Sequence, residues 1–593
     1  MRTLFCFLIL LIVANPIHAA PDLQAQIADL LEVQRLEGAV WTTLDSHGAA
    51  GVSKRQSQEP MQPDHKVQVG SIAKPVLATG ILRLITEGRL SLDTPVCELL
   101  PSLSFDNAWN ASDPVRIRHL LDHTSGLDDI HFWHVFSTTA RADTPLAAAF
   151  PPNDGLLRVR HRPGKRHSYS NMGYTLLGMV IEVVTGQRYE SYLDSALLAP
   201  LGMRNSTFGF VTQSTDTKLA MGHFENGIAQ RAMPSYVRPA GQLTTTAADM
   251  ARFARFLMSD GSVDGKRFID QALLRQMSAP ANTEAARAGL QVGYGLGLRR
   301  LDRDGAAANC HGGSTIGFKA MLCMFPEVQK AFFIAFNTDS EMADYKAFNL
   351  LLASAISPAL PKTALVYPTA VGFDSRPWQG CYIPAPNRFD TMRLIDTVFG
   401  ALLVRAEGTK LSLYTLQGAS VSLAPVGTAL YRAPGKILPS HALLVSAEGR
   451  RVITTGTQSY EKIPAMYLIS LTISIAAGIC GFAWITIKGL TRVARRRMSW
   501  REPLAPALAG THALLLPLPL FFAQSYLQLG EMTPASILLA IATAALPLAM
   551  LSGLAMTIRS KSVQLTDTVA MGAVLQFSIV LASWGLLPLK LWV

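Results

Sequence analysis

The chain has 593 residues, more than one ordinary domain holds, so we expect two or three structural units. Its formal charge of +11 does not indicate a nucleic-acid-binding protein, because about half of the excess lies in one basic cluster between two apolar segments, with no nucleic-acid-reading motif. Only six cysteines are present, which excludes a dense disulfide scaffold.

Residues 1–20 are predicted to be a secretory signal peptide. Arg2 precedes an apolar run over residues 4–13, and small residues follow at Ala19 and Ala20. Export would place the next domains in an oxidising compartment. There Cys310 and Cys323, which flank a predicted hairpin, could face each other, although the sequence leaves open whether they pair.

The first part of the chain is predicted to mix helices and strands. Apolar residues recur at helical spacing over residues 24–36, and strands follow from Gly38. Further helices are predicted over 115–126, over 169–185 and from 239 onward, and strands over 294–298, around 311, 318–325 and 331–336. Helices between two sets of strands predict an α+β domain whose N- and C-terminal strands meet in one antiparallel sheet.

The stretch Val69–Pro75 opens a predicted helix. Ser71 would lie at its N-terminus, where free N–H groups favour a developing negative charge. Lys74 lies three residues further on and would project from the same face. A desolvated lysine can serve as the base that a serine nucleophile needs. The same pattern recurs at Ser459 and Lys462, a match that we interpret as accidental.

Two later stretches are candidates for the same site. Tyr169 and Asn171 stand at the start of a nearly all-apolar helix, where the phenol could exchange protons with serine and the amide could bind substrate and lysine. They could equally fill a domain seam and cap the helix. In the run His311, Gly312, Gly313 and Ser314, two glycines would let a substrate lie against a strand edge, and the Ser314 N–H could join that of Ser71 in an oxyanion hole. The alternative for this run is a plain hairpin turn.

The rest of the chain divides into two units. Short, partly alternating runs over residues 366–460, one of them 391–395, predict a small antiparallel barrel or sandwich. Four apolar spans follow at about 464–487, 503–526, 535–558 and 568–590, each long enough to cross a bilayer. Basic residues lie after the first and third spans, so both loops are predicted to be cytoplasmic and the domains before residue 460 to be outside. The isolated polar residues His512, Gln524 and Gln576 in the spans are interpreted as helix-packing residues.

Residues 25–355 resemble the penicillin-binding-protein-like serine hydrolases, nearest the class C β-lactamase and esterase branch. The resemblance rests on ordered blocks that include the three candidate motifs, His119–Leu127, Pro163–Tyr174 and Pro200–Met203. It implies an antiparallel sheet flanked by helices plus a helical subdomain over 21–360, with residues 366–460 as an appended β-domain. It also implies that Ser71 is acylated, that Lys74 and Tyr169 share the base and acid roles, and that Asn171 positions substrate.

One departure bears on the substrate. Where many relatives have Lys-Thr-Gly, this chain has His311, Gly312 and Gly313, and histidine is the weaker anion partner at neutral pH. We therefore expect weak or no β-lactamase activity, and an ester or a D-amino-acid amide or peptide, possibly derived from the cell wall, as substrate. The expected setting is the bacterial inner membrane, with the catalytic domain on the periplasmic side.

The sequence also bears on two other classes of function. A non-catalytic sensor or assembly factor that binds peptidoglycan peptides is the main alternative. An α/β-hydrolase is disfavoured, because Ser71 lacks a Gly-x-Ser-x-Gly elbow. No cofactor is expected, and no metal, because the histidines between the first two motifs lack a dense ligand spacing: His123, His131, His134, His161 and His167.

Overall fold

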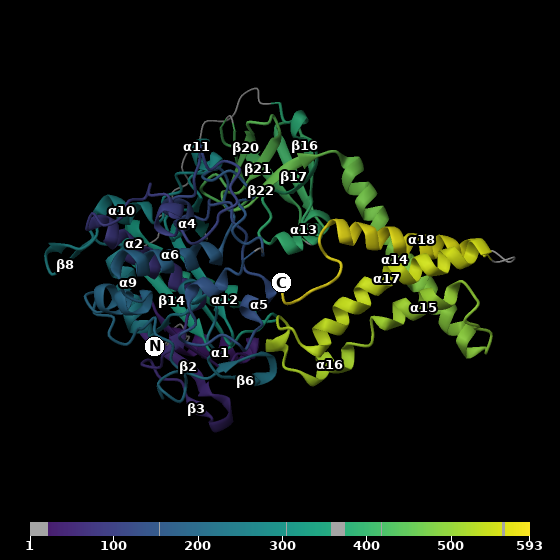
Figure 1. Ribbon diagram of the computed structural model, residues 1–593. Coiled ribbons are helices and arrows are strands. Elements are labelled where there is room, and N and C mark those ends of the chain that lie inside the picture. The colour runs from purple at the N-terminus through teal and green to yellow at the C-terminus, as the bar shows by residue number, and fades with distance from the viewer. Residues whose placement is uncertain are drawn as a thin grey trace, which may run out of the picture.

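The computed structural model describes residues 22–152, 154–303, 305–356, 374–416, 418–427, 429–559 and 564–593. The predicted signal peptide lies outside the described residues, as does the connection between the first two units. Figure 1 shows an α+β unit (residues 23–356), a barrel (376–463) and a helical bundle (465–583).

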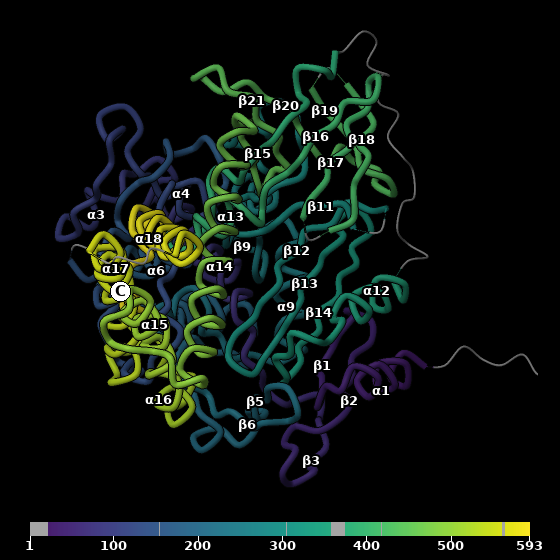
Figure 2. The backbone as a smooth tube through the Cα atoms, turned by 90° about the vertical axis from the view of Figure 1, so that its right-hand side faces the viewer, coloured from purple at the N-terminus to yellow at the C-terminus, as the bar shows by residue number. Residues whose placement is uncertain are grey.

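The α+β unit is built on one antiparallel sheet of eight strands. In spatial order these are β10 (Gly293–Tyr294), β11 (Arg299–Arg303), β12 (Ala306–Thr315), β13 (Phe318–Phe325), β14 (Lys330–Phe336), β1 (Gly38–Thr42), β2 (His47–Lys54) and β3 (Glu59–Pro60). The early strand β1 pairs with the late strand β14, with Val40 opposite Ala335. The expected meeting of N- and C-terminal strands in one sheet is thus confirmed, and Figure 2 shows these strands side by side.

Helices cover both faces of this sheet. On one face, α1 (Leu23–Gln34) and α12 (Tyr345–Ile356) pack their apolar residues against Trp41 and Phe332. The larger core on the other face contains α2 (Ala73–Thr86) and α6 (Asn171–Thr185). The remaining helices of the unit are α3 (Val96–Leu99), α4 (Ile117–Leu121), α5 (Phe132–Val135), α7 (Tyr189–Leu193), α8 (Arg238–Gly241), α9 (Ala247–Leu257), α10 (Gln271–Gln276) and α11 (Glu284–Arg287). Three short two-stranded sheets complete it: β4 (Val67–Gln68) with β7 (Thr244–Thr245), β5 (Gly222–His223) with β6 (Ala229–Gln230), and β8 (Ser262–Val263) with β9 (Lys266–Arg267).

The helix expected over residues 115–126 is shorter than predicted. It ends at Leu121, because the Asp122 carboxylate accepts hydrogen bonds from both the N–H and the hydroxyl of Thr124 and so stabilises a turn instead of another helical turn. His123 then adopts a positive φ of 58°. Its side chain is thereby turned back toward α6, where its Nδ1 accepts from the Ser170 N–H at 3.1 Å.

The second unit is a closed barrel whose last strand pairs with its first. Its strands are β15 (Gly380–Pro384), β16 (Leu402–Glu407), β17 (Lys410–Thr415), β18 (Val421–Pro425), β19 (Leu430–Arg432), β20 (His441–Val445), β21 (Arg451–Thr454) and β22 (Ser459–Ile463). The predicted strand over 391–395 is wrong. That segment leads into the helix α13 (Arg393–Phe399), where Leu394 and Thr397 lie three residues apart and are both buried.

The bundle contains four helices that are long and apolar enough to cross a membrane. They are α14 (Ala465–Ala494), the interrupted pair α15 (Leu504–Ala513) and α16 (Leu518–Ala523), α17 (Pro534–Arg559) and α18 (Leu565–Ser583). The second span is broken ahead of α16, where Pro517 stands at the helix start. The fourth ends seven residues earlier than predicted, with Gly585 at a φ of 75° just beyond its end. Gln576 links α18 to α14 through Ser474 (2.6 and 2.8 Å), as a packing residue would.

Candidate active site

Ser71 and Lys74 occupy adjacent turns at the start of α2. Ser71 lies in a short 3-10 turn over Gly70–Ile72, and α2 begins two residues later. The Lys74 Nζ lies 3.0 Å from the Ser71 Oγ, and the lysine side chain is fully buried. The short-range pairing expected from the sequence is therefore present.

Three oxygen atoms surround the Lys74 Nζ, and either its ammonium or its neutral amine can satisfy them. Besides Ser71, its Nζ contacts the Asn171 Oδ1 and the Ala240 carbonyl oxygen, each at 2.7 Å. A neutral amine has two N–H donors for these two acceptors, which leaves its lone pair facing the Ser71 hydroxyl. Burial lowers the pKa of Lys74 well below its usual value, and the nearby Arg388 cation adds to this, while Asp129 opposes it. The site thus favours the form of Lys74 that can accept a proton.

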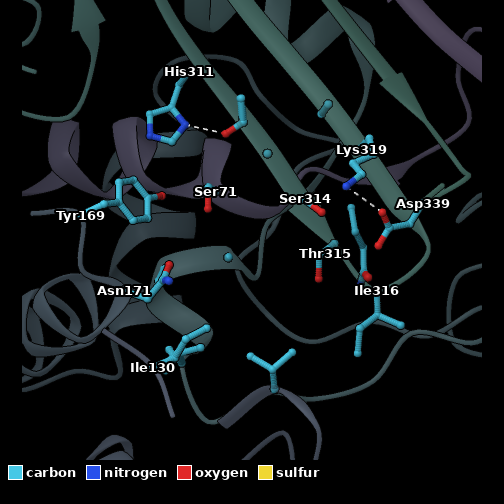
Figure 3. Close-up of a pocket in the computed structure, with 18 of the residues that line it drawn as sticks. Ser71, Ile130, Tyr169, Asn171, His311, Ser314, Thr315, Ile316, Lys319 and Asp339 are labelled. Carbon is cyan, nitrogen blue, oxygen red and sulfur yellow. Dashed lines mark hydrogen bonds and ion pairs between the residues drawn. The ribbon is translucent and has the colours of Figure 1, made fainter. Parts of the chain in front are cut away.

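Tyr169 completes the group from the opposite side. Its hydroxyl points toward Ser71 in Figure 3, and its ring centroid lies 4.9 Å from the Lys74 Nζ. Burial raises the pKa of the Tyr169 phenol, an effect that a hydrogen bond with Ser71 only partly offsets. A tyrosinate is therefore disfavoured in the resting site. The phenol is held in the form that can donate a proton.

Asn171 is oriented by a residue that sequence reasoning missed. The carboxylate of Asp129, which is fully buried, accepts from the Asn171 backbone N–H at 2.7 Å and from its Nδ2 at 2.9 and 3.2 Å. With Nδ2 committed to Asp129, Oδ1 must face Lys74. The helix cap of α6 is not Asn171 but Ser170, whose hydroxyl accepts from the Gly173 N–H. The capping alternative for Asn171 is therefore wrong.

A second missed residue enters the site from the barrel. Arg388 donates from Nε to the Asp129 carboxylate at 2.6 Å, and its guanidinium lies 4.6 Å from the centroid of the Tyr169 ring. Asp129 has a weak sequence signal, because it forms half of an Asp-Asp pair directly after the block His119–Leu127. Arg388 has none, since it belongs to another folding unit and lies 259 residues from its partner.

The strand β12 carries the run from His311 to Ser314 along the other wall of the site. A Cβ added to Gly313 would lie 1.8 Å from the Val69 carbonyl oxygen and 3.1 Å from the Ser71 nitrogen. A Cβ on Gly70 would lie 2.5 to 2.7 Å from backbone atoms of Ser314. Glycine at these two positions therefore allows the strand and the turn that bears Ser71 to approach backbone to backbone. The run therefore lines a cleft beside Ser71 and is not only a hairpin turn.

His311 is a neutral residue in this setting. Burial lowers the pKa of His311 to about 3, and Lys74 in its protonated form acts in the same direction. Its Nδ1 lies 2.7 Å from the Gly312 carbonyl oxygen, to which it can only donate, so Nε2 accepts from the Tyr294 hydroxyl at 2.8 Å. With both ring nitrogens occupied, His311 supplies no positive charge to the cleft.

Ser71 opens into a cleft of about 910 Å³ that all three units line. Figure 3 shows Tyr169 and His311 to one side of Ser71, and Ile316 with the ion pair of Lys319 and Asp339 (2.8 Å) to the other. The barrel contributes Arg388 and Thr457, and the bundle contributes Tyr526. Seven residues of the three predicted motifs thus line this one cleft, namely Ser71, Tyr169, Asn171, His311, Gly312, Gly313 and Ser314.

Other features noted in the sequence lie apart from this chemistry. Ser459 and Lys462 stand on β22 of the barrel, where Ser459 donates to Thr454 and Lys462 to the Pro377 carbonyl oxygen. Cys310 and Cys323 are paired across β12 and β13 and form a disulfide. Among the described residues, no group of three or more His, Cys, Asp or Glu side chains is placed to hold a metal ion.

Residues 23–355 match the family model described as Beta-lactamase. Penicillin-binding protein 4 of Amycolatopsis lactamdurans is 32% identical over 303 residues, which cover 49% of this chain and 76% of that protein. Esterase EstB of Burkholderia gladioli is 32% identical over 206 residues, or 32% of this chain and 51% of that protein. Among solved structures, the octameric penicillin-binding protein homologue from Pyrococcus abyssi aligns over 74% of this chain and 99% of that chain, at 20% identity and a TM-score of 0.48. The chain therefore belongs to the β-lactamase family of serine hydrolases, whose members include penicillin-binding proteins and esterases.

Proposed function

We propose that this protein is a membrane-anchored serine hydrolase that forms an acyl-enzyme on Ser71 and cleaves an ester or a D-amino-acid amide. One observation carries the proposal: the buried Lys74 Nζ lies 3.0 Å from the Ser71 Oγ, with its other two contacts occupied by oxygen acceptors. A lone pair directed at a serine hydroxyl is what general-base activation of that hydroxyl requires.

The reaction would begin with attack of the Ser71 Oγ on the substrate carbonyl carbon, while the hydroxyl proton passes to the Lys74 Nζ. The Tyr169 phenol donates its proton to the leaving oxygen or nitrogen and regains one from the Lys74 ammonium. The bond between carbonyl and leaving group breaks, and the acyl group stays on Ser71. Water then attacks the acyl-enzyme, gives up one proton to the same base, and releases the acid as Ser71 recovers its hydrogen.

The oxyanion of each step needs donors that are already in place. The backbone N–H groups of Ser71 and Ser314 are our candidates, because the close approach allowed by Gly70 and Gly313 brings their two segments together at the nucleophile. Asn171 would serve as a positioning group, with its amide plane held by Asp129.

The nature of the cleft bears on the substrate. A neutral His311 stands where many relatives place a lysine, so strong binding of a penicillin carboxylate at that position is not expected. One relative is named as an esterase, which supports an ester as substrate. A D-amino-acid amide or peptide, possibly of cell-wall origin, remains in the proposal because the same acyl transfer chemistry serves both bonds.

Location at the bacterial inner membrane, with the α+β unit and the barrel on the periplasmic side, is part of the proposal. Four helices of the bundle are long and apolar enough to cross a bilayer. The basic residues gather at one end of this bundle, around Lys488 and Arg492 near the start of α18. The positive-inside bias puts that end in the cytoplasm and the opposite end, with both globular units, outside.

Labelling with a fluorophosphonate probe tests the nucleophile. The full-length protein should be labelled, and Ser71→Ala should abolish the label. Ser459→Ala is the matched control, because it removes the serine of the other Ser-x-x-Lys pair and should label like the wild type. Label that survives Ser71→Ala would exclude Ser71 as the nucleophile. A wild type that binds cell-wall peptides but is neither labelled nor able to hydrolyse any ester would favour the sensor alternative.

A further inference from the structure

The loop between the second and third spans, residues 524–533, is bound to the α+β unit. We call it the outer loop. The Glu531 Oε1 accepts from the Thr138 N–H at 2.6 Å and from the Thr138 hydroxyl at 2.7 Å. The Gly530 N–H donates to the Phe136 carbonyl oxygen at 2.8 Å. Three hydrogen bonds from one short loop thus hold it to the segment that follows α5.

The contact is close as well as polar. A Cβ on Gly530 would lie 2.4 Å from the Trp133 Cα, so the two backbones touch at this point. The segment that is hydrogen-bonded to the outer loop also lines the substrate cleft, through Val135, Phe136 and Ser137. Movement of the outer loop would therefore move one wall of the cleft.

The outer loop also reaches the cleft directly. Tyr526 lines the cleft and packs edge to face on Phe224, with the ring centroids 5.3 Å apart. Phe224 follows β5, and both views place α16 beside the β5–β6 hairpin (Figures 1 and 2). The membrane segment thus contributes a side chain to the same cleft as Ser71.

The two ends of the cleft differ in polarity. Beyond Tyr169 lies the Arg388 guanidinium. On the opposite side of Ser71 lie Ile316 and the ion pair of Lys319 and Asp339. The aromatic pair of Phe224 and Tyr526 lies near Asp339, whose N–H donates to the carbonyl oxygen of His223, the neighbour of Phe224. A substrate that spans Ser71 would therefore meet a cation at one end. At the other end it would meet Ile316 and the two aromatic rings beside an ion pair whose charges offset each other.

The apolar end continues into the surface of the bundle. Around the outer loop, Phe522 is 88% exposed and Met532 is 65% exposed, and Tyr526 is 43% exposed. Tyrosine at the end of a span is typical of the boundary between lipid and water. These exposed apolar groups would lie at the outer surface of the bilayer, and Tyr526 among them also lines the cleft.

We infer that the outer loop is part of the substrate site and that the substrate is a carbonyl compound with a long alkyl chain, drawn from the outer leaflet of the membrane. The chain would lie along Tyr526 and Phe224 and the polar part toward Arg388, with the scissile carbonyl at Ser71. This inference rests on the proposed function and names its substrate class. It also gives the bundle a role beyond anchoring, because a loop held between two spans is needed to form the wall.

The test uses the full-length protein in phosphatidylcholine vesicles and two probes, methylumbelliferyl acetate in solution and methylumbelliferyl palmitate within the bilayer. Tyr526→Ala and Glu531→Ala should each lower kcat/KM for the palmitate by at least about tenfold, since each removes apolar contact or a charged hydrogen bond. Turnover of the acetate should fall by a much smaller factor than that of the palmitate, because the acetyl group is too short to use the wall formed by the outer loop. Tyr467→Ala is the matched control: Tyr467 is 45% exposed near the start of α14, and its removal should change neither rate.

Fluorophosphonate labelling of Ser71 in each variant shows that the site is intact. Equal losses on both esters, or no loss on the palmitate, would overturn the role of the outer loop while leaving the proposed function in place. A wild type that is labelled and cleaves the acetate but not the palmitate would overturn the substrate class alone. Absence of both labelling and ester cleavage in the wild type would overturn the proposed function and this inference together.

Discussion

Arg388 of the barrel donates from its Nε to the buried carboxylate of Asp129 in the α+β unit, at 2.6 Å. Asp129 in turn holds the Asn171 amide that faces Lys74. The appended barrel thereby reaches the groups that set the charge of the proposed base. Because Arg388 and Asp129 carry opposite charges near Lys74, removing them one at a time should shift its proton affinity in opposite directions.

Arg388→Gln should move the acidic limb of the pH–rate profile to higher pH. The Arg388 cation disfavours the Lys74 ammonium, so its loss raises the pKa of Lys74, and a higher pH is needed to form the neutral base. The measurement is kcat/KM for a short ester across pH. Arg405→Gln, which removes an exposed arginine on β16 of the same barrel, should leave the midpoint unchanged. A midpoint that stays in place or falls in Arg388→Gln would show that this cation does not act on the base.

Asp129→Asn should have the opposite effect on the midpoint and also lower the maximal rate. The Asp129 anion raises the pKa of Lys74, so its loss lowers that pKa further and shifts the acidic limb to lower pH. Loss of the charged acceptor also frees the Asn171 amide, which we expect to lower kcat by about 10- to 100-fold. A purely structural role for Asp129 would reduce the rate without moving the midpoint, and that result would contradict this assignment.

Lys74→Ala and Tyr169→Phe should each slow acylation by about 10²-fold or more, as expected for loss of a general base or acid. The rate of fluorophosphonate labelling measures this step directly. Lys462→Ala is the control, since Lys462 donates only to the Pro377 carbonyl oxygen among the interactions described for it and lies on the barrel. An unchanged labelling rate in either test variant would remove that residue from the proton transfer.

Gly313→Ala should lower the rate of the reaction at Ser71 through a steric clash. Its new Cβ would lie 1.8 Å from the Val69 carbonyl oxygen, so β12 and the Ser71 turn must separate, which would carry the Ser314 N–H away from the nucleophile. Loss of an oxyanion donor is worth about 10²- to 10³-fold in rate. Gly173→Ala in α6 is the control, because its Cβ would meet Leu120 at an ordinary 3.7 Å. Near-normal labelling of a folded Gly313→Ala variant, with folding checked by circular dichroism, would contradict the close approach.

The disulfide between Cys310 and Cys323 should stabilise the two strands that bear the cleft edge. Its loss in Cys310→Ser should lower the free energy of unfolding by about 2–4 kcal/mol, seen as a lower Tm of the protein purified under oxidising conditions. Mass spectrometry of alkylated, unreduced protein should show two protected thiols in the wild type. Cys97→Ser, which alters a free cysteine, should keep the wild-type Tm. Alkylation of both Cys310 and Cys323 in the unreduced wild type would show that the bond does not form.

The parts of the site that follow from short-range spacing could be predicted. Ser71 and Lys74 are one helical turn apart, so any helix that begins there brings them together. The same holds for the alternating runs that became strands of the sheet and barrel, and for the apolar spans of the bundle. The ordered blocks shared with a known family added the roles of Tyr169 and Asn171, which spacing by itself does not link to Ser71.

The sequence by itself determined the candidate pair of Ser71 and Lys74, the division into an α+β unit, a barrel and four apolar helices, and the likeness to serine hydrolases. Tertiary structure alone decided that Asp129 orients Asn171, that Arg388 and Tyr526 enter the cleft from other units, and that His311 is neutral. The physical reason is that contacts between segments far apart in the chain produce no periodic pattern in the sequence. Protonation states depend on burial, and burial exists only once those segments have packed.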